Sequence, residues 1–138
     1  EDIFPEHADP QPGVRMMTSM APTVARAPAG DICALGAAGS ARIRSAVLQV
    51  LVHVVDGALS LEQAVAHPRI HTEGDTIYIE AYGRTPEEVE ALRPLGTEAI
   101  MTYEAGFFFG GVQAAAQRGN RLAAAADVVR RGCGFKIV

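Results

Sequence analysis

The sequence predicts an α/β (α+β) domain in which helices pack on a largely antiparallel sheet. Three observations lead to this prediction. The chain has 138 residues, of which 49% are hydrophobic and 20% charged, enough apolar material for the core of one domain. Short β-compatible runs are separated by turn residues, and two helix starts carry capping boxes.

The first predicted elements are a hairpin and a long helix. Residues 23–27 and 31–35 are β-compatible runs separated by a Pro-Ala-Gly turn. Glycine-rich residues 36–39 end the hairpin, and Ser40 is a plausible N-cap for a helix over residues 41–56. Valines in this stretch favour a strand, but a strand of that length would be unusual, so we predict a helix.

The middle of the chain carries clear start and stop signals. Gly57 suits the left-handed position that ends a helix, and Ser60 begins a capping box for a second helix that Pro68 ends. Residues 76–80 predict a strand. Thr85, followed by proline and two glutamates, predicts another capped helix that ends before Pro94. The last third reads as strands over residues 99–103, 107–109 leading into 112–117, and 122–126.

Composition excludes several classes of partner. The formal net charge is −4 and the basic residues are scattered, so the sequence indicates no nucleic-acid partner and no membrane-surface binding. No apolar run is long enough to insert into a membrane.

The histidines and cysteines do not predict a metal site. His67 and His71 have helical ligand spacing, but Pro68 interrupts that helix, so no metal site is predicted. Cys33 and Cys133 are predicted to be small buried hydrophobes, although a disulfide stays open.

The most informative stretch is the small-residue turn at residues 36–40, between a predicted strand and a predicted helix. Unpaired backbone N–H groups and the positive end of the helix meet there, which favours negative charge. The anion would be a phosphate or the oxyanion of an acyl-transfer intermediate. Taken alone, close packing is the better explanation of such a turn.

Several motifs resemble the γ-glutamyltransferase family in an ordered way. Residues 12–23 read Pro-Gly-Val-Arg-Met-Met-Thr-Ser-Met-Ala-Pro-Thr, which is similar to the family's Pro-Gly-x-Arg-x-x-Ser-Ser-Met-x-Pro-Thr. Residues 36–45 resemble the loop and helix start that contain the family's paired glycines. The similarity continues through residues 47–50, 62–66, 68–71 and 108–112.

This resemblance implies an N-terminal nucleophile hydrolase fold of four αββα layers, in which autocleavage of a precursor exposes a threonine. Residues 1–22 would form a substrate-binding loop segment, and residues 23–138 the C-terminal part of the small-subunit domain. The implied reaction is γ-glutamyl transfer or hydrolysis through a threonine acyl-enzyme, with glutathione as the usual donor. The family uses no metal or organic cofactor.

The resemblance also implies site residues. Ala38 and Gly39 match the paired glycines whose backbone amides stabilise the oxyanion. Thr18 and Ser19 match paired serines that hold the substrate α-carboxylate, although ordinary loop hydroxyls are the alternative. Asp2 matches the acidic residue that pairs with the α-amino group, with the neighbouring Glu1 as competitor and a solvated loop carboxylate as the alternative.

Some positions depart from the family or stay outside its site. Ala38 replaces a glycine, and residues 127–130 lack the usual Asp-Pro-Arg, which leaves the substrate range open. Arg15 and Arg42 are interpreted as surface or structural ion-pair residues. The three phenylalanines at 107–109 are interpreted as a buried strand rather than an aromatic binding face.

The chain contains no N-terminal threonine, so the fragment alone is expected to be inactive. Its implied partners are the γ-glutamyl substrate, the rest of the small subunit and the large subunit. Without them, exposed apolar surface would allow self-association. The alternative hypothesis is a non-catalytic module that binds an anion or serves a structural role. A periplasmic or secreted location is implied by the family alone, and the cytoplasm stays open.

Overall fold

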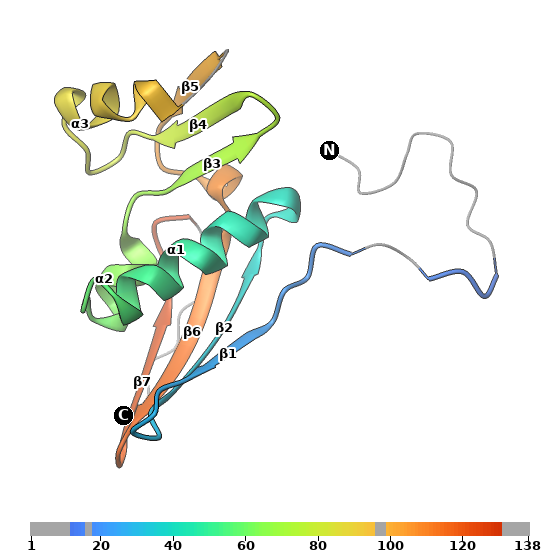
Figure 1. The fold of residues 1–138 in the computed structure, drawn as a ribbon, viewed down its shortest axis with the longest axis vertical. Helices are drawn as coiled ribbons and strands as arrows, with labels where there is room; N and C mark the ends of the chain where they lie inside the picture. The colour runs from blue at the N-terminus through green and yellow to red at the C-terminus, as the bar shows by residue number, and fades with distance from the viewer. Residues whose placement is uncertain (1–11, 16–17, 96–98, 131–138) are drawn as a thin grey trace.

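A computed structural model describes residues 12–15, 18–95 and 99–130 of the chain (Figure 1). The described residues form helices and strands, with three short 3-10 turns labelled η. In order they are β1 Thr23–Arg26, β2 Ile32–Ala38, η1 Ser40–Arg42, α1 Ile43–Val55, α2 Leu61–Ala66, β3 Ile70–Glu73, β4 Thr76–Glu80, α3 Pro86–Ala91, η2 Arg93–Leu95, β5 Ala99–Tyr103, η3 Phe107–Phe109, β6 Gly111–Arg118 and β7 Arg121–Ala126. This content confirms the α+β class.

The larger sheet has the strand order β1-β2-β6-β7, and every neighbouring pair is antiparallel. Helices α1 and α2 lie on one face of this sheet (Figure 1). Alternate side chains of the strands point toward the helices and form the core. The fully buried members of that core include Leu35 on β2, Val50 on α1, Val65 on α2 and Val112 on β6.

A smaller sheet has the order β3-β4-β5. Its first two strands are antiparallel, whereas β4 and β5 are parallel. The predicted largely antiparallel arrangement therefore holds, with one parallel pair as the exception. Ile77 and Ile79 of β4 are buried, and α3 lies beside this sheet (Figure 1).

Both predicted capping boxes are present. The Ser60 hydroxyl accepts a hydrogen bond from the Gln63 backbone N–H, and the Gln63 side chain accepts one from the Ser60 N–H. Thr85 and Glu88 repeat this exchange at the start of α3, with Pro86 in the first turn. These signals are local, so the sequence is sufficient to predict them.

Two predicted helix ends are wrong in detail. Ser40 does not cap α1: it lies inside η1 with a φ of 53°, and Arg42 occupies the N-cap position without a side-chain cap. At the other end the left-handed residue is Ala58, with a φ of 50°, rather than Gly57. Position 57 requires glycine for a different reason: a Cβ there would lie only 2.9 Å from the His53 carbonyl oxygen.

The predicted strand at residues 107–109 is also wrong. These phenylalanines form the 3-10 turn η3, and β6 begins only at Gly111. Phe109 is buried, whereas Phe107 is 53% exposed, so the segment is not a uniformly buried strand. The sequence analysis also did not predict β3.

Two further observations concern the described residues. None of the helices there is both long and apolar enough to cross a bilayer. Cys33 is a free thiol of intermediate exposure, less buried than predicted, and Cys133 lies outside the described residues.

Candidate functional site

The predicted oxyanion turn lies where β2 ends and the helical layer begins. Ala38 is the last residue of β2 and is opposite Gly111 of β6. The next two residues leave the sheet in left-handed conformations, with φ values of 140° for Gly39 and 53° for Ser40. The Arg42 N–H closes the turn by donating to the Gly39 carbonyl at 3.1 Å. Gly39 therefore sits at the sharp strand-to-helix turn, and Ala38 belongs to the sheet.

Two glycines allow this turn to contact the segment before β6. A Cβ added to Gly39 would lie 2.7 Å from the Gly110 Cα, and one added to Gly110 would lie 2.8 Å from the Ala38 carbonyl oxygen. Distances this short leave no room for a side chain at either position. The two backbones therefore fix one another.

Arg42 also joins the turn to η3. Its Nε donates to the Phe108 carbonyl at 3.1 Å, and its guanidinium carbon lies 4.7 Å from the centroid of the Phe108 ring. Phe108 is in turn stacked on Tyr103, with ring centroids 4.7 Å apart. Arg42 thus contacts a carbonyl and an aromatic face, contacts that the interpretation as a surface or ion-pair residue did not predict.

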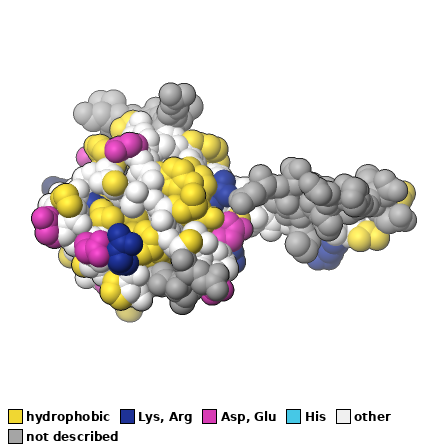
Figure 2. All heavy atoms as spheres, turned by 90° about the horizontal axis from the view of Figure 1, so that it is seen from above, with side chains coloured by type: hydrophobic (Ala, Val, Ile, Leu, Met, Phe, Trp, Pro, Cys, Tyr) yellow, Lys and Arg dark blue, Asp and Glu magenta, His cyan; other side chains and the backbone are white. Residues whose placement is uncertain are grey.

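The end of the molecule seen from above in Figure 2 presents hydrophobic side chains with scattered charged ones around them. Large hydrophobic residues on β5 and η3 are partly exposed, namely Met101, Tyr103 and Phe107. Tyr103 belongs to the aromatic cluster that carries Arg42. Through Arg42 and Phe108, the turn at Gly39 is therefore joined to an aromatic cluster.

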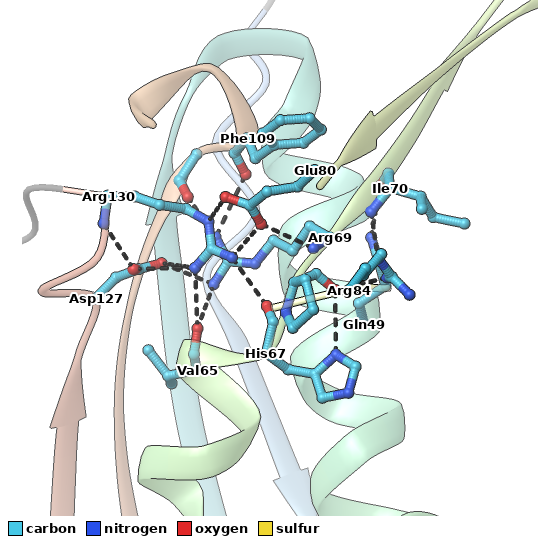
Figure 3. Close-up of polar contacts among 12 residues, drawn as sticks. Gln49, Val65, His67, Arg69, Ile70, Glu80, Arg84, Phe109, Asp127 and Arg130 are labelled. Atoms are coloured by element: carbon cyan, nitrogen blue, oxygen red, sulfur yellow. Dashed lines mark hydrogen bonds and ion pairs between the residues drawn. The ribbon is translucent and has the colours of Figure 1, made fainter. Parts of the chain in front are cut away.

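Behind the turn lies a buried network of two arginines and two carboxylates (Figure 3). Arg69, Glu80, Asp127 and Arg130 are each at most 2% exposed. Arg69 pairs with Asp127 at 2.8 Å, and Arg130 donates to both Asp127 oxygens at 3.1 Å. Arg130 also pairs with Glu80, whose second oxygen accepts the Arg69 backbone N–H at 2.8 Å. The charges balance, as burial requires.

This network supports the turn through Arg69. The Arg69 guanidinium donates to the Phe109 carbonyl at 3.3 Å and to the Gly110 carbonyl, so it holds the residue that contacts Gly39. Burial, together with the nearby Arg130 charge, lowers the pKa of Arg69 to about 10, although Asp127 opposes both effects. Arg69 therefore remains a cation at neutral pH.

This network was not predicted from the sequence. Its members come from the loop before β3, the end of β4 and the segment after β7 (Figure 3). Asp127 and Arg130 were noted only as part of a departure from the family. The available signal was Glu80, a carboxylate at the end of an otherwise apolar strand.

Helix α1 is fastened to β3 by two polar side chains. The Gln49 amide donates to the Ile70 carbonyl at 2.8 Å and accepts from the Ile70 N–H at 2.9 Å. One turn earlier, the Ser45 hydroxyl lies 2.8 Å from His71 Nδ1. Burial lowers the pKa of His71, so the imidazole is neutral at pH 7.

The predicted substrate residues lie at the same end of the β1–β2 hairpin as Gly39, but the structure does not join them to it. The Thr18 hydroxyl accepts a local hydrogen bond from the Met20 N–H at 3.1 Å, and Ser19 is of intermediate exposure. The chain before β1 diverges from β2 (Figure 1). Asp2 and Glu1 lie outside the described residues.

The described residues contain no group of three or more metal-ligating side chains placed to hold an ion. His67 and His71, which share helical spacing, engage different partners. His67 Nδ1 lies 3.1 Å from the Pro68 carbonyl, and His71 contacts Ser45. His67 instead stacks near His53, with ring centroids 4.0 Å apart.

Comparison with known proteins agrees with this geometry. The family model described as gamma-glutamyltranspeptidase matches residues 4–136. The chain is 33% identical over 134 residues to a glutathione hydrolase proenzyme of Pseudomonas aeruginosa, covering 92% of this chain and 23% of that protein. It is 42% identical over 69 residues to an "Acylase ACY 1" proenzyme of Pseudomonas sp. strain SE83, covering 50% of this chain and 12% of that protein. The chain thus spans a quarter or less of these relatives.

Among solved structures, the chain is similar to a gamma-glutamyltranspeptidase from Pseudomonas nitroreducens complexed with L-DON. The TM-score is 0.74 at 34% identity, over 93% of this chain and 67% of that one. A helical layer on an antiparallel sheet, with a small-residue turn between them, places the chain among the N-terminal nucleophile hydrolases. More narrowly, it belongs to the gamma-glutamyltranspeptidase family.

Proposed function

We propose that the protein containing this chain transfers or hydrolyses the γ-glutamyl group of glutathione-like amides through a threonine acyl-enzyme. In this proposal the chain supplies oxyanion and substrate contacts, and the nucleophile comes from another segment. The observation that carries the proposal is the turn at Gly39, fixed against Gly110 within a chain that the family model matches over residues 4–136.

The chemistry assigned to the turn follows from charge development. Attack of a hydroxyl on the γ-glutamyl carbonyl forms a tetrahedral intermediate whose oxygen becomes negative. Backbone N–H groups held in advance stabilise that oxygen without reorganising. The hydrogen bond that closes the turn is accepted by the Gly39 carbonyl and does not involve the Gly39 N–H. This supports the Gly39 N–H as one of the oxyanion donors. Its neighbour Ala38, or Ser40 with its left-handed backbone, would supply the second amide.

We assign the remaining substrate contacts from the family pattern. Thr18 and Ser19 would bind the α-carboxylate, and Asp2 would pair with the α-ammonium group. A charge-assisted hydrogen bond from a hydroxyl to a carboxylate suits the first pair. In the described structure Thr18 is exposed and its hydroxyl accepts one local bond, so it still has a hydrogen to donate.

We propose that the rest of the small subunit and the large subunit pack against the uncovered face of the larger sheet. The face opposite α1 and α2 carries the cross-strand row Val24, Ala34, Ala115 and Ala124. Val24 is 71% exposed, and Leu122 in the adjacent row is 63% exposed. Such a flat apolar face suits packing against a second sheet. The rest of the enzyme would supply this second sheet. In the isolated chain, self-association would cover the apolar face.

The proposal is tested with the full-length protein after maturation, by measuring release of p-nitroaniline from γ-glutamyl-p-nitroanilide. Gly39→Ala keeps the backbone N–H but should displace it, because the new Cβ would lie 2.7 Å from the Gly110 Cα. If the N–H no longer reaches the oxyanion, the release rate should fall by about 10²-fold, the scale of losing one oxyanion donor. Gly36→Ala is the matched control, because a Cβ at Gly36 meets nothing within 4 Å. A mature, folded protein that releases nothing and binds phosphate would instead support the anion-binding module.

An acylase activity is a second candidate because of the similarity to Acylase ACY 1 over half the chain. Glutaryl-p-nitroanilide separates the two candidates, since it keeps the distal carboxylate but lacks the α-amino group. A γ-glutamyl enzyme that uses Asp2 should strongly prefer the γ-glutamyl anilide. An equal or greater rate with the glutaryl anilide would favour the acylase.

We also propose a periplasmic or secreted location. The proposal rests on the family alone, and fractionation of the native host tests it. Activity recovered only in the cytoplasmic fraction would contradict it.

A further inference from the structure

A cavity of about 630 Å³ lies at the end of the larger sheet away from Gly39. The last turn of α1 and the first turn of α2 form one side, and the ends of the β1–β2 and β6–β7 hairpins form the other. Its size falls within the range of small-molecule sites. Cys33, on its sheet side, is five residues before Ala38 on β2, about 16 Å at the usual rise of a strand.

The cavity exists because small side chains occupy one row across all four strands. Strand pairing aligns Ala25 with Cys33, Cys33 with Ala116, and Ala116 with Ala123. This row lies on the helix-facing side of the sheet, beneath apolar side chains of α1 and α2. The short side chains leave the space open, and the walls that face it include Val54 and Leu61.

The mouth of the cavity is cationic. Arg118 is opposite Arg121 at the end of the β6–β7 hairpin, and both line the cavity with Arg26. The acidic residue in the lining is Asp31, whose carboxylate already accepts the Gly119 N–H at 3.2 Å. Two like charges directly across a hairpin repel one another, and a bound anion between them would remove that cost.

Arg118 is two residues beyond Ala116, the strand partner of Cys33, and therefore lies on the same face of the sheet. Burial raises the pKa of the Cys33 thiol, and the Arg118 charge acts in the opposite direction. An apolar interior with a cationic rim is complementary to a molecule that has an aliphatic chain and one negative group.

We propose that this cavity binds an amphipathic carboxylate, with its aliphatic chain over the Ala25–Cys33–Ala116–Ala123 row and its carboxylate between Arg118 and Arg121. The site is separate from the proposed reaction centre, so it goes beyond the proposed function. Binding here would bridge α1, α2 and both hairpins.

The test uses the mature full-length enzyme and decanoate as the probe. Decanoate should bind in a saturable way by titration calorimetry and should slow alkylation of Cys33 by N-ethylmaleimide, followed by peptide mass spectrometry. Two further probes separate charge from chain: acetate has the charge alone, and decyltrimethylammonium has the chain with the opposite charge. Both should protect Cys33 at least tenfold less well than decanoate.

The double variant Arg118→Gln/Arg121→Gln should weaken decanoate binding at least tenfold. Both arginines are exposed, so the variant should fold normally, which its melting temperature will confirm. Arg93→Gln is the matched control, an exposed arginine on η2 outside the cavity, and it should bind decanoate like the unchanged enzyme.

Three outcomes would overturn the proposal. The first is equal protection of Cys33 by decanoate and by the cationic amphiphile, which would indicate apolar binding alone. The second is undiminished decanoate binding by the double variant. The third is no saturable binding, with Cys33 already protected in the free enzyme, which would show that another segment of the complete protein fills the cavity. None of these outcomes bears on γ-glutamyl activity.

Discussion

The two ends of strand β2 differ in how small residues are used. At Gly39 the absence of a side chain lets two backbones meet, with a Cβ position only 2.7 Å from the Gly110 Cα. At Cys33 the row of small side chains instead borders a cavity, with Val54 of α1 and Leu61 of α2 on its other side. Small residues therefore produce either a rigid contact or an empty space, and the neighbouring segment decides which.

The supporting interactions differ in the same way. Behind Gly39 the charges are buried and paired within the Arg69–Glu80–Asp127–Arg130 network. Around the cavity the arginines are exposed, and two of them face each other across a hairpin. A fixed geometry suits the oxyanion role proposed for the turn, whereas solvent-exposed positive charge suits the anionic ligand proposed for the cavity. Four predictions test the rigid end.

The largest effect is expected from breaking the buried network. Arg130→Met should lower the free energy of unfolding by about 3–5 kcal/mol, because Glu80 and Asp127 would remain buried without their shared cation. Urea denaturation of the mature enzyme measures the change. The control is Glu90→Gln, which breaks an exposed pair with Arg93 and should cost less than about 1 kcal/mol. Similar losses in both variants would mean that the buried pairs do not hold this end together.

The next effect concerns the glycine contact. Gly110→Ala combines a φ of 74° with a Cβ 2.8 Å from the Ala38 carbonyl oxygen, so it should cost about 1–3 kcal/mol and lower kcat. The adjacent Gly111→Ala is the control, because a Cβ at Gly111 would lie at an ordinary contact distance of 3.8 Å from its nearest atom. Thermal unfolding and anilide hydrolysis report the two effects. Equal tolerance of both alanines would contradict the rigid contact.

A smaller effect is expected at Arg42. Arg42→Lys keeps the charge but loses the planar group that donates to Phe108 and stacks on its ring, so about 1 kcal/mol of stability should be lost. If Arg42 positions the turn, kcat for the anilide should fall while KM stays unchanged. Arg44→Lys, at an exposed arginine in the first turn of α1, should change neither. A change confined to KM would instead indicate a role in binding substrate.

The smallest effect is a pH dependence. Burial lowers the pKa of His71, so its imidazole stays neutral in the folded protein at pH values where the unfolded chain already protonates it. The contribution of His71 to stability is complete above its ordinary pKa of 6.5 and should be lost as the pH falls toward the lowered value. Urea denaturation between pH 7.5 and about 5 measures the slope. His71→Gln should reduce that slope, and an unchanged slope would rule out His71 as its source.

Local signals made much of the fold predictable from sequence. The capping boxes at Ser60 and Thr85 each depend on residues three positions apart, and both are present. The phenylalanines at residues 107–109 fit a strand by propensity, but contacts with Arg42 and Arg69 hold them in a 3-10 turn. Those contacts span 66 and 40 residues, and no local pattern contains them.

Only part of the candidate site could be predicted from the sequence. The strand-to-helix turn at Gly39 could be located from its small residues, and at Gly39 itself the structure leaves no room for a side chain. Its partner Gly110 and the supporting Arg69 could not, since they come close only after both sheets form. The roles of Ala38, Gly39, Thr18, Ser19 and Asp2 stay predictions.

The double hydrogen bond between the Gln49 side chain and Ile70 has a consequence for assembly. A primary amide that donates to a carbonyl and accepts from the N–H of the same residue imitates the peptide group of a neighbouring strand. Strand β3 is an edge of its sheet, and edges tend to recruit foreign strands. At Ile70 that docking position is already taken, so further growth of this sheet is directed to its opposite margin, at β5.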